Sequence, residues 1–160
     1  GKAVLRGTDV TLDEVDSPTF VGIHQRDFCF ELITDISVSG ENGCGGVTVY
    51  MTELEHYDIA VRKNGSGYEA VLKLNIGGIK HEQTVLTLAS GDAKLIVRAD
   101  NCQYNFYVSQ GGVETCLGSG SAKYLSSEVA GGFTGVVIGL YAVGNVSAEF
   151  TGFGLNYTKE

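Results

Sequence analysis

The chain of 160 residues contains no tryptophan, and its single proline is Pro18. Tryptophan is the aromatic residue that sugar-binding surfaces use most, because the C–H faces of sugars pack well on large π-systems. Its absence weighs against a carbohydrate-binding platform built on exposed aromatic rings. The scarcity of proline, combined with 23 glycines, predicts many tight turns and few rigid loops.

Basic residues are also few, since 11 lysines and arginines stand against 19 aspartates and glutamates, for a formal charge of −8. Only Arg62 and Lys63 are adjacent, whereas phosphate binding needs clustered cations. The sequence therefore excludes nucleic acid as a partner. An acidic surface suits a protein whose ligand is neutral, such as a carbohydrate, and equally a protein with no ligand.

No apolar run approaches the ~20 residues that a membrane-spanning helix requires, so we expect no membrane partner. Hydrophobic residues make up 43% of the chain, which excludes disorder. A chain of this length can form one hydrophobic core without a metal ion or a disulfide. We therefore expect a single domain over residues 1–160. The sequence assigns no cellular compartment.

The short motifs of common enzymes and metal sites are missing: there is no CxxC, H-x-x-x-H, GxSxG, phosphate-binding loop or dinucleotide-binding fingerprint. We therefore expect no cofactor and no catalytic residue. A glycosidase needs two carboxyl groups facing each other across a cleft, and no such pair stands out among the 19 acids.

An acidic run lies near the N-terminus. Its members are Asp9, Asp13, Glu14 and Asp16. Their spacing matches no EF-hand-type calcium loop, so a solvated segment is the preferred interpretation and a structural calcium ion is the alternative. The histidines occur singly, which is typical of surface or hydrogen-bonded core residues. They are His24, His56 and His81.

Strand register argues against disulfides. The cysteines are Cys29, Cys44, Cys102 and Cys116. A turn at 110–112 would place Cys116 opposite about position 106, and a turn at 40–43 would place Cys29 opposite about position 53. We therefore expect buried free thiols.

Alternation of apolar and polar residues recurs along most of the chain and predicts antiparallel strands separated by glycine-containing turns. The pattern is clear in 28–38, 47–51, 59–61, 68–74, 85–88, 93–99, 104–108 and 146–150. Asn64-Gly65 is the strongest hairpin signal. Residues 133–141 are too apolar to face water on either side, which predicts a central strand of a two-layer structure. The fold class is all-β, an antiparallel sandwich or jelly roll.

Several tyrosines could contact a sugar, although their alternating positions favour the core. They are Tyr50, Tyr57, Tyr104, Tyr107 and Tyr124.

Residues 125–145, LSSEVAGGFTGVVIGLYAVGN, closely resemble the AGGFTGVxIGLYATGN signature of the C-terminal β-sandwich domain in glycoside hydrolase family 43. The stretch 20–28 resembles the FxGRRQxHF segment of that family, with Ile23 and His24 in place of the paired arginines. Residues 55–57 and 104–107 resemble its xxHYY and YxFxYS strands. The FDWF and DGxxWxxLG motifs appear here without their tryptophans, so ligand contacts by those residues are not carried over.

The resemblance implies a concanavalin A-like sandwich that packs on an upstream five-bladed propeller. That propeller would hold the catalytic carboxylates that hydrolyse β-xylosides or α-L-arabinosides. It also implies that Phe133, in a loop reaching toward the propeller, closes one wall of the sugar pocket. Gln25 and Tyr57 are further substrate-binding candidates because they match positions of the family motifs. Xylo- or arabino-oligosaccharides would then be the ligands.

On this interpretation the chain is a non-catalytic accessory domain, taken from or related to the C-terminal region of a larger hydrolase. An independent lectin-like, carbohydrate-binding module is the alternative. A structural or adhesion sandwich without a sugar role is the third interpretation.

Overall fold

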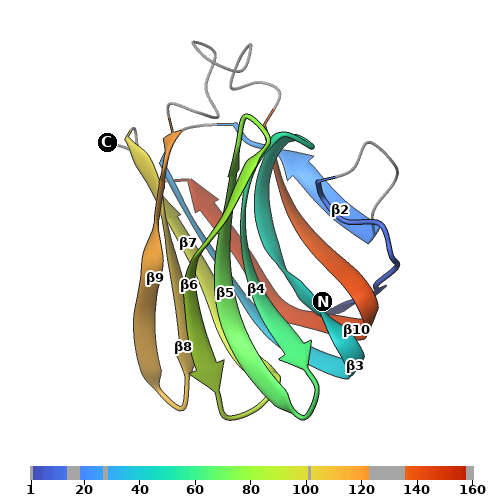
Figure 1. Cartoon of the computed structure of the whole chain (residues 1–160). Coiled ribbons are helices and arrows are strands. Elements are labelled where there is room, and N and C mark those ends of the chain that lie inside the picture. The colour runs from blue at the N-terminus through green and yellow to red at the C-terminus, as the bar shows by residue number, and fades with distance from the viewer. Residues whose placement is uncertain (1, 14–18, 27–28, 101, 123–135, 158–160) are drawn as a thin grey trace.

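The computed structural model describes residues 2–13, 19–26, 29–100, 102–122 and 136–157, and these ranges form ten β-strands (Figure 1). The strands are β1 (Lys2–Arg6), β2 (Thr19–His24), β3 (Phe30–Thr52), β4 (Glu55–Asn64), β5 (Gly67–Ile76), β6 (Ile79–Leu88), β7 (Asp92–Ala99), β8 (Gln103–Gln110), β9 (Val113–Ser121) and β10 (Val137–Tyr157). Every ladder between these strands is antiparallel. The all-β class is therefore confirmed.

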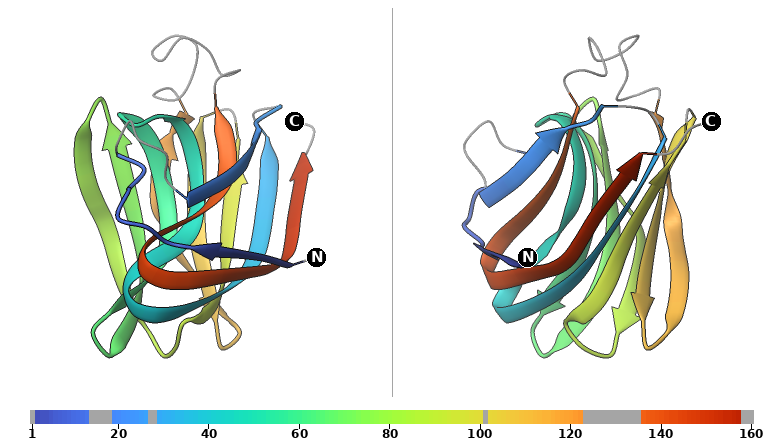
Figure 2. Two further views of the ribbon diagram at one scale, coloured as in Figure 1. Left: turned by 90° about the vertical axis from the view of Figure 1, so that its right-hand side faces the viewer. Right: turned by 180° about the vertical axis from the view of Figure 1, so that it is seen from behind.

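Two strands pass through both layers of the sandwich. The first half of β3 pairs with β7, and its second half pairs with β4. β10 runs antiparallel along almost all of β3 and pairs with β2 near its start and with β1 farther on. One layer thus has the order β6-β5-β4-β3-β10-β2 and the other β9-β8-β7-β3-β10-β1, joined where β3 and β10 bend (Figure 2).

Glycines allow this bend. Gly40 and Gly144 have φ values of 136° and 88°, a region that side chains with a Cβ rarely adopt. A Cβ at Gly144 would also lie 2.6 Å from the carbonyl oxygen of Asn42. The expected turn at 40–43 is wrong, because the chain continues through this corner as one strand, as strands that switch between layers do. The strand expected at 146–150 is likewise the middle part of one longer strand, 137–157, which bends at the same corner.

The expected hairpins are confirmed at three tight turns. Asn64 pairs with Gly67 around Gly65, Ile76 pairs with Ile79 around Gly77-Gly78, and Gln110 pairs with Val113 around Gly111-Gly112. The turn glycines all have positive φ, as two-residue hairpin loops between twisted strands require. The first half of β10 lies between β2 and β3, so the apolar segment that ends at Tyr141 is a central strand, as expected.

The main core fills the space between the two layers. Its largest fully buried side chains are Tyr57, Phe30, Phe106, Phe150, Leu32, Ile59, Leu72, Leu95 and Ile138. A second, smaller cluster lies on the outer face of β3, β4, β5 and β10. It is covered by residues 7–13, which we call the N-terminal segment. It consists of Leu12, Cys44, Ala60, Val71 and Tyr141.

The four cysteines are free thiols, as expected, but only Cys29 and Cys44 are buried. Cys102 and Cys116 are exposed, so the expectation of burial is wrong for these two. Cys116 pairs with Tyr107 and not with position 106, because the hairpin loop consists of two residues, Gly111 and Gly112, with Gln110 paired to Val113. Within the described ranges, no helix is long and apolar enough to cross a membrane.

Candidate functional site

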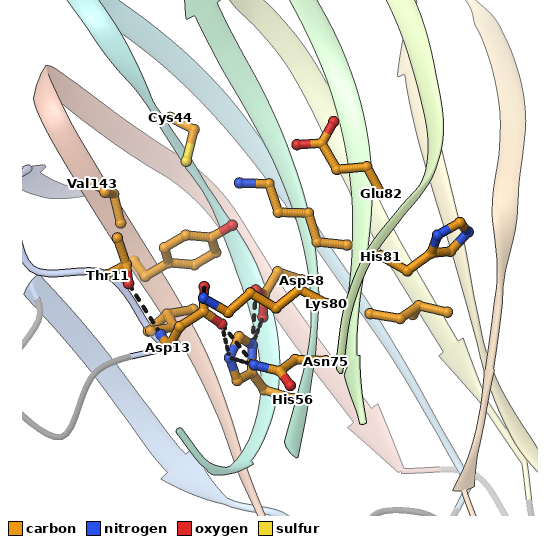
Figure 3. Close-up of a pocket in the computed structure, with 14 residues that line it drawn as sticks. Thr11, Asp13, Cys44, His56, Asp58, Asn75, Lys80, His81, Glu82 and Val143 are labelled. Atoms are coloured by element: carbon orange, nitrogen blue, oxygen red, sulfur yellow. Dashed lines mark hydrogen bonds and ion pairs between the residues drawn. The ribbon is translucent and has the colours of Figure 1, made fainter. Parts of the chain in front are cut away.

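A pocket of about 220 Å³ opens on the outer face of the first layer, where the side chain of Asp13 reaches toward β4 and β5 from the N-terminal segment, residues 7–13 (Figure 3). Its walls combine carboxylates, amines and an imidazole with an apolar floor. The lining residues are Thr11, Leu12, Asp13, Cys44, His56, Asp58, Lys73, Leu74, Asn75, Lys80, His81, Glu82, Tyr141 and Val143.

The N-terminal segment is tied to β10 before it reaches the pocket. The amide of Gly7 donates to the Val146 carbonyl at 2.9 Å, and the amide of Gly144 donates to the Thr8 carbonyl at 2.7 Å. Leu12 then inserts into the small outer cluster and is 3% exposed. This insertion brings Asp13 next to the sheet, where it forms one wall of the pocket.

His56 connects the sheet to that segment. Its Nδ1 lies 2.8 Å and 2.9 Å from the two carboxylate oxygens of Asp58, and its Nε2 lies 2.8 Å from Oδ1 of Asp13. Thr48 donates its hydroxyl to Asp58 at 2.6 Å. Figure 3 shows the two carboxylates approaching the ring from different sides. A ring whose two nitrogens both face carboxylates carries a proton on each, so this geometry favours the imidazolium.

Neighbouring charges and hydrogen bonds shift the pKa values of His56 and Asp13. Burial alone would lower the pKa of His56, but the hydrogen bond and charge of Asp58, with those of Asp13, raise it above its ordinary value. Partial burial alone would raise the pKa of Asp13, but the Asn75 hydrogen bond and the charges of His56 and Lys80 lower it. These charge-assisted contacts hold the N-terminal segment on the sheet.

Asn75 and Lys80 complete the contacts of Asp13. Nδ2 of Asn75 donates to Oδ1 of Asp13 at 2.8 Å, and Nζ of Lys80 lies 3.5 Å from Oδ2. The side chain of Asn75 is buried, and its Oδ1 has no hydrogen-bond partner among the described residues. Asp13 is therefore an ion-pair partner and not a solvated residue, whereas Asp9 is exposed.

The other acids of that run, Glu14 and Asp16, lie outside the described residues. Within the described part of the chain, no group of three or more His, Cys, Asp or Glu side chains could hold a metal ion. His56 is a hydrogen-bonded core histidine and His24 and His81 are exposed, as expected.

A second network lies at one end of the sandwich and contains three of the expected sugar contacts, which are Tyr57, Tyr104 and Gln25. The hydroxyl of Tyr57 donates to the Ser121 carbonyl at 2.7 Å, and its ring packs edge-on against Tyr104 at 6.0 Å between centroids. The hydroxyl of Tyr104 donates to Oε1 of Gln25 at 2.9 Å, and the backbone N–H of Gln25 donates to the Val136 carbonyl at 2.9 Å. This chain of contacts joins residue 121 to residue 136.

Neither Tyr57 nor Gln25 faces solvent: the first is fully buried and the second is 4% exposed. Burial raises the pKa of Tyr104 to about 12 despite its bond to Gln25, which keeps its hydroxyl a proton donor. Phe133 and Tyr124, two further expected contacts, lie outside the described residues.

The other two candidate tyrosines lie apart from this end. Tyr50 is partly buried and stacks on His56, with 5.4 Å between ring centroids. Tyr107 lies under the guanidinium of Arg98 at 4.7 Å.

The outer pocket was not predicted from the sequence. The spacing of His56 and Asp58 indicated part of it, because residues two apart in a strand lie on the same face. Nothing in the sequence indicated that Asp13, 43 residues before His56, would meet them.

Comparisons with known proteins give one consistent result. Residues 1–154 match the family described as the β-xylosidase C-terminal concanavalin A-like domain. The chain is 32% identical over 154 residues to the non-reducing end α-L-arabinofuranosidase BoGH43B of Bacteroides ovatus, covering 93% of this chain and 29% of that protein. It is 25% identical over 140 residues to a xylosidase/arabinosidase of Butyrivibrio fibrisolvens, covering 84% of this chain and 26% of that protein.

Among solved structures, the Bacteroides ovatus xyloglucan-locus GH43B superimposes with a TM-score of 0.88 and 29% identity, over 99% of this chain and 33% of that one. The chain thus spans about a third or less of the length of these relatives.

Proposed function

Because this chain belongs to the family of β-xylosidase C-terminal concanavalin A-like domains, we propose that it is the non-catalytic accessory domain of a xylosidase- or arabinofuranosidase-type glycosidase. Residues 1–160 form this one domain. It packs on an upstream catalytic propeller and helps to shape the pocket that holds a xylo- or arabino-oligosaccharide. The main support is the family match over residues 1–154, together with relatives roughly three times as long.

The described acids support a role without catalysis in this chain. Glycoside hydrolysis needs one carboxyl group as acid and another as base or nucleophile, facing each other across a sugar. Of the three carboxylates that line the outer pocket, Asp13 and Asp58 face the His56 ring and Glu82 is paired with Arg62. Held as ion pairs, they are not available as an acid/base pair.

The Tyr57–Tyr104–Gln25 network supports the pocket-shaping part of the proposal. It fixes Ser121 and Val136, which flank the stretch that contains Phe133. Phe133 would then close one wall of the sugar pocket with an aromatic face. Tyr57 and Gln25, which are buried, act as positioning residues for that wall.

The test is Phe133→Ala in two proteins, the isolated domain and a polypeptide that joins it to the catalytic part. The isolated variant should stay within about 1 kcal/mol of the parent in urea unfolding, as is usual for residues outside the core. In the joined protein, kcat/KM for an aryl xyloside or arabinoside should fall, and Phe133→Tyr should retain most of it. A loss of about 3 kcal/mol or more in the isolated domain would identify Phe133 as a core residue and overturn this role.

Tyr57→Phe separates positioning from mere structure, because it removes only the hydroxyl that reaches Ser121. In the joined protein it should raise KM while kcat is retained. If only the unfolding midpoint changes, Tyr57 has no part in the sugar pocket.

The outer pocket favours a second candidate function, an independent carbohydrate-binding module. Its walls offer amine donors and carboxylate acceptors above an apolar floor that includes Leu12 and Tyr141, a combination that suits a neutral polyhydroxylated ligand. Isothermal titration of the isolated chain with xylobiose and arabinobiose tests this function. Binding should be lost in Lys73→Ala and kept in Lys94→Ala, a lysine outside the pocket. The absence of saturable heat with both sugars would discard it.

A further inference from the structure

The two layers of the sandwich do not close over the core at the edge formed by β1 and β2. Val21 and Ile23 pair with Leu140 and Ile138 of β10 and so point toward the interior. Inward positions are normally buried, yet these two side chains are 57% and 52% exposed. The core is therefore open to solvent along β2.

Phe153 extends this apolar surface from the other layer. It lies in a β-bulge of β10, where the register shifts between Thr151 and Gly154, and it is 45% exposed. Bulges commonly re-aim a side chain in this way. Val21, Ile23 and Phe153 form what we call the open edge, and they line one groove of about 350 Å³ with the core residues Ile138, Leu140 and Phe150.

The backbone of this edge is also incomplete. Within the described ranges, β1 and β2 each pair only with β10, so each has one side without a neighbouring strand. A sheet edge that combines unpaired backbone groups with exposed apolar side chains promotes association, and proteins normally cover or charge it. The charge at this groove is limited to Lys2.

We propose that the open edge is the surface on which this domain docks to the catalytic part of the same polypeptide. This inference rests on the proposed function and deepens it by naming the surface. The family description places the domain at the C-terminus of its proteins, and about two thirds of each relative lies outside the match. Lys2 itself lines the groove, so any chain that precedes it enters beside the open edge (Figure 2).

Hydrogen exchange measures the docking without any substitution. The amides of β2 should exchange about tenfold or more slowly in the joined polypeptide than in the isolated domain, because a covered edge opens less often. The amides of the β8–β9 hairpin serve as an internal reference and should exchange equally in both. Equal exchange of β2 in the two proteins would overturn the proposal.

Charge insertion provides the matched variants. Ile23→Lys should make the isolated domain less prone to self-association and should remove the extra protection of β2 in the joined polypeptide. Ile79→Lys and Val113→Lys are the controls, because both residues are exposed, at 77% and 66%, and lie at hairpins outside the groove. These controls should leave the protection of β2 unchanged.

Sedimentation of the isolated domain identifies a competing occupant. A dimer that Ile23→Lys abolishes, with unchanged β2 exchange in the joined protein, would assign the open edge to a second copy and overturn the proposal.

Pocket shaping and docking at the open edge can be disproved independently of each other. If Phe133→Ala loses kcat/KM but β2 gains no protection in the joined polypeptide, the proposal of pocket shaping stands and that of this docking surface fails. If β2 gains protection but Phe133→Ala is fully active, the docking surface stands and pocket shaping fails.

Discussion

At one edge of the sandwich, β6 and β9 approach each other from opposite layers. The hydroxyl of Thr84 donates to the Leu117 carbonyl, and a Cβ at Gly118 would lie 2.5 Å from Nε2 of Gln83. At the opposite edge, Ile23 of β2 points inward and is half exposed. The same core is thus bridged by its own side chains at one edge, where a groove of about 180 Å³ remains, and is left uncovered at the other.

This difference indicates which edge the domain completes by itself. Where β6 meets β9, polar side chains bridge the layers and Leu117 is buried. At the open edge, apolar area stays in contact with water at a cost of roughly 25 cal/mol for each Å². A partner that covers this edge recovers that free energy, which is the physical basis for docking there.

The largest effect we expect separates the two edges directly. Leu117→Ala should destabilise the isolated domain by about 2–5 kcal/mol, because it removes a buried side chain and leaves a cavity. Ile23→Ala should cost about 1 kcal/mol or less, because its side chain is already half solvated. Urea unfolding monitored by circular dichroism measures both. Equal losses would show that the open edge is as well packed as the closed one.

A smaller effect on stability should come from the pH. It concerns the N-terminal segment, which follows β1 and is held by His56. In the folded chain the pKa of His56 lies above its ordinary value of 6.5. The protonated ring therefore stabilises the fold fully below pH 6.5, and this contribution is lost as the pH rises through the higher folded value. Asp13 has the opposite sign: its pKa is lowered from 3.8, so its contribution is lost as the pH falls through the folded value.

We therefore expect the unfolding free energy to decrease as the pH rises above about 6.5. The protection factor of the Leu12 amide should fall there, while the protection factors of the β9 amides should stay unchanged. His56→Gln should flatten this dependence. His24→Gln, which changes an exposed histidine, should leave it intact. A pH profile that is the same in wild type and His56→Gln would contradict the role of His56 in holding the N-terminal segment.

The smallest effect should come from Phe153→Ser. Its side chain is 45% exposed in the isolated domain, so the unfolding free energy should change by only about 0.5 kcal/mol. Solubility should increase, because the substitution reduces the apolar area of the open edge. Urea unfolding and the concentration at which light scattering rises measure the two properties. A large loss of stability would mean that Phe153 packs as a core residue.

The sequence alone was enough to predict most of the local structure. Period-2 alternation and glycine turns depend on neighbouring residues, so the hairpins at Asn64-Gly65 and Gly111-Gly112 could be read from a few positions. The apolar run that ends at Tyr141 indicated an interior strand, because a strand without a polar face has to be covered on both faces, and the first half of β10 does lie between β2 and β3. The glycoside hydrolase resemblance of residues 125–145 likewise agreed with the family match.

Only the tertiary structure decided the features that depend on distant partners. Glycines with positive φ serve both turns and bends, so whether 40–43 reverses the chain or bends it depends on β10, which lies about a hundred residues away and accompanies β3 through the corner. The meeting of Asp13 with His56 and Asp58 required the N-terminal segment to bring Asp13 close to β4. The exposure of Val21 and Ile23 follows from where the two layers diverge, because an inward-facing residue is buried only if the opposite layer reaches it.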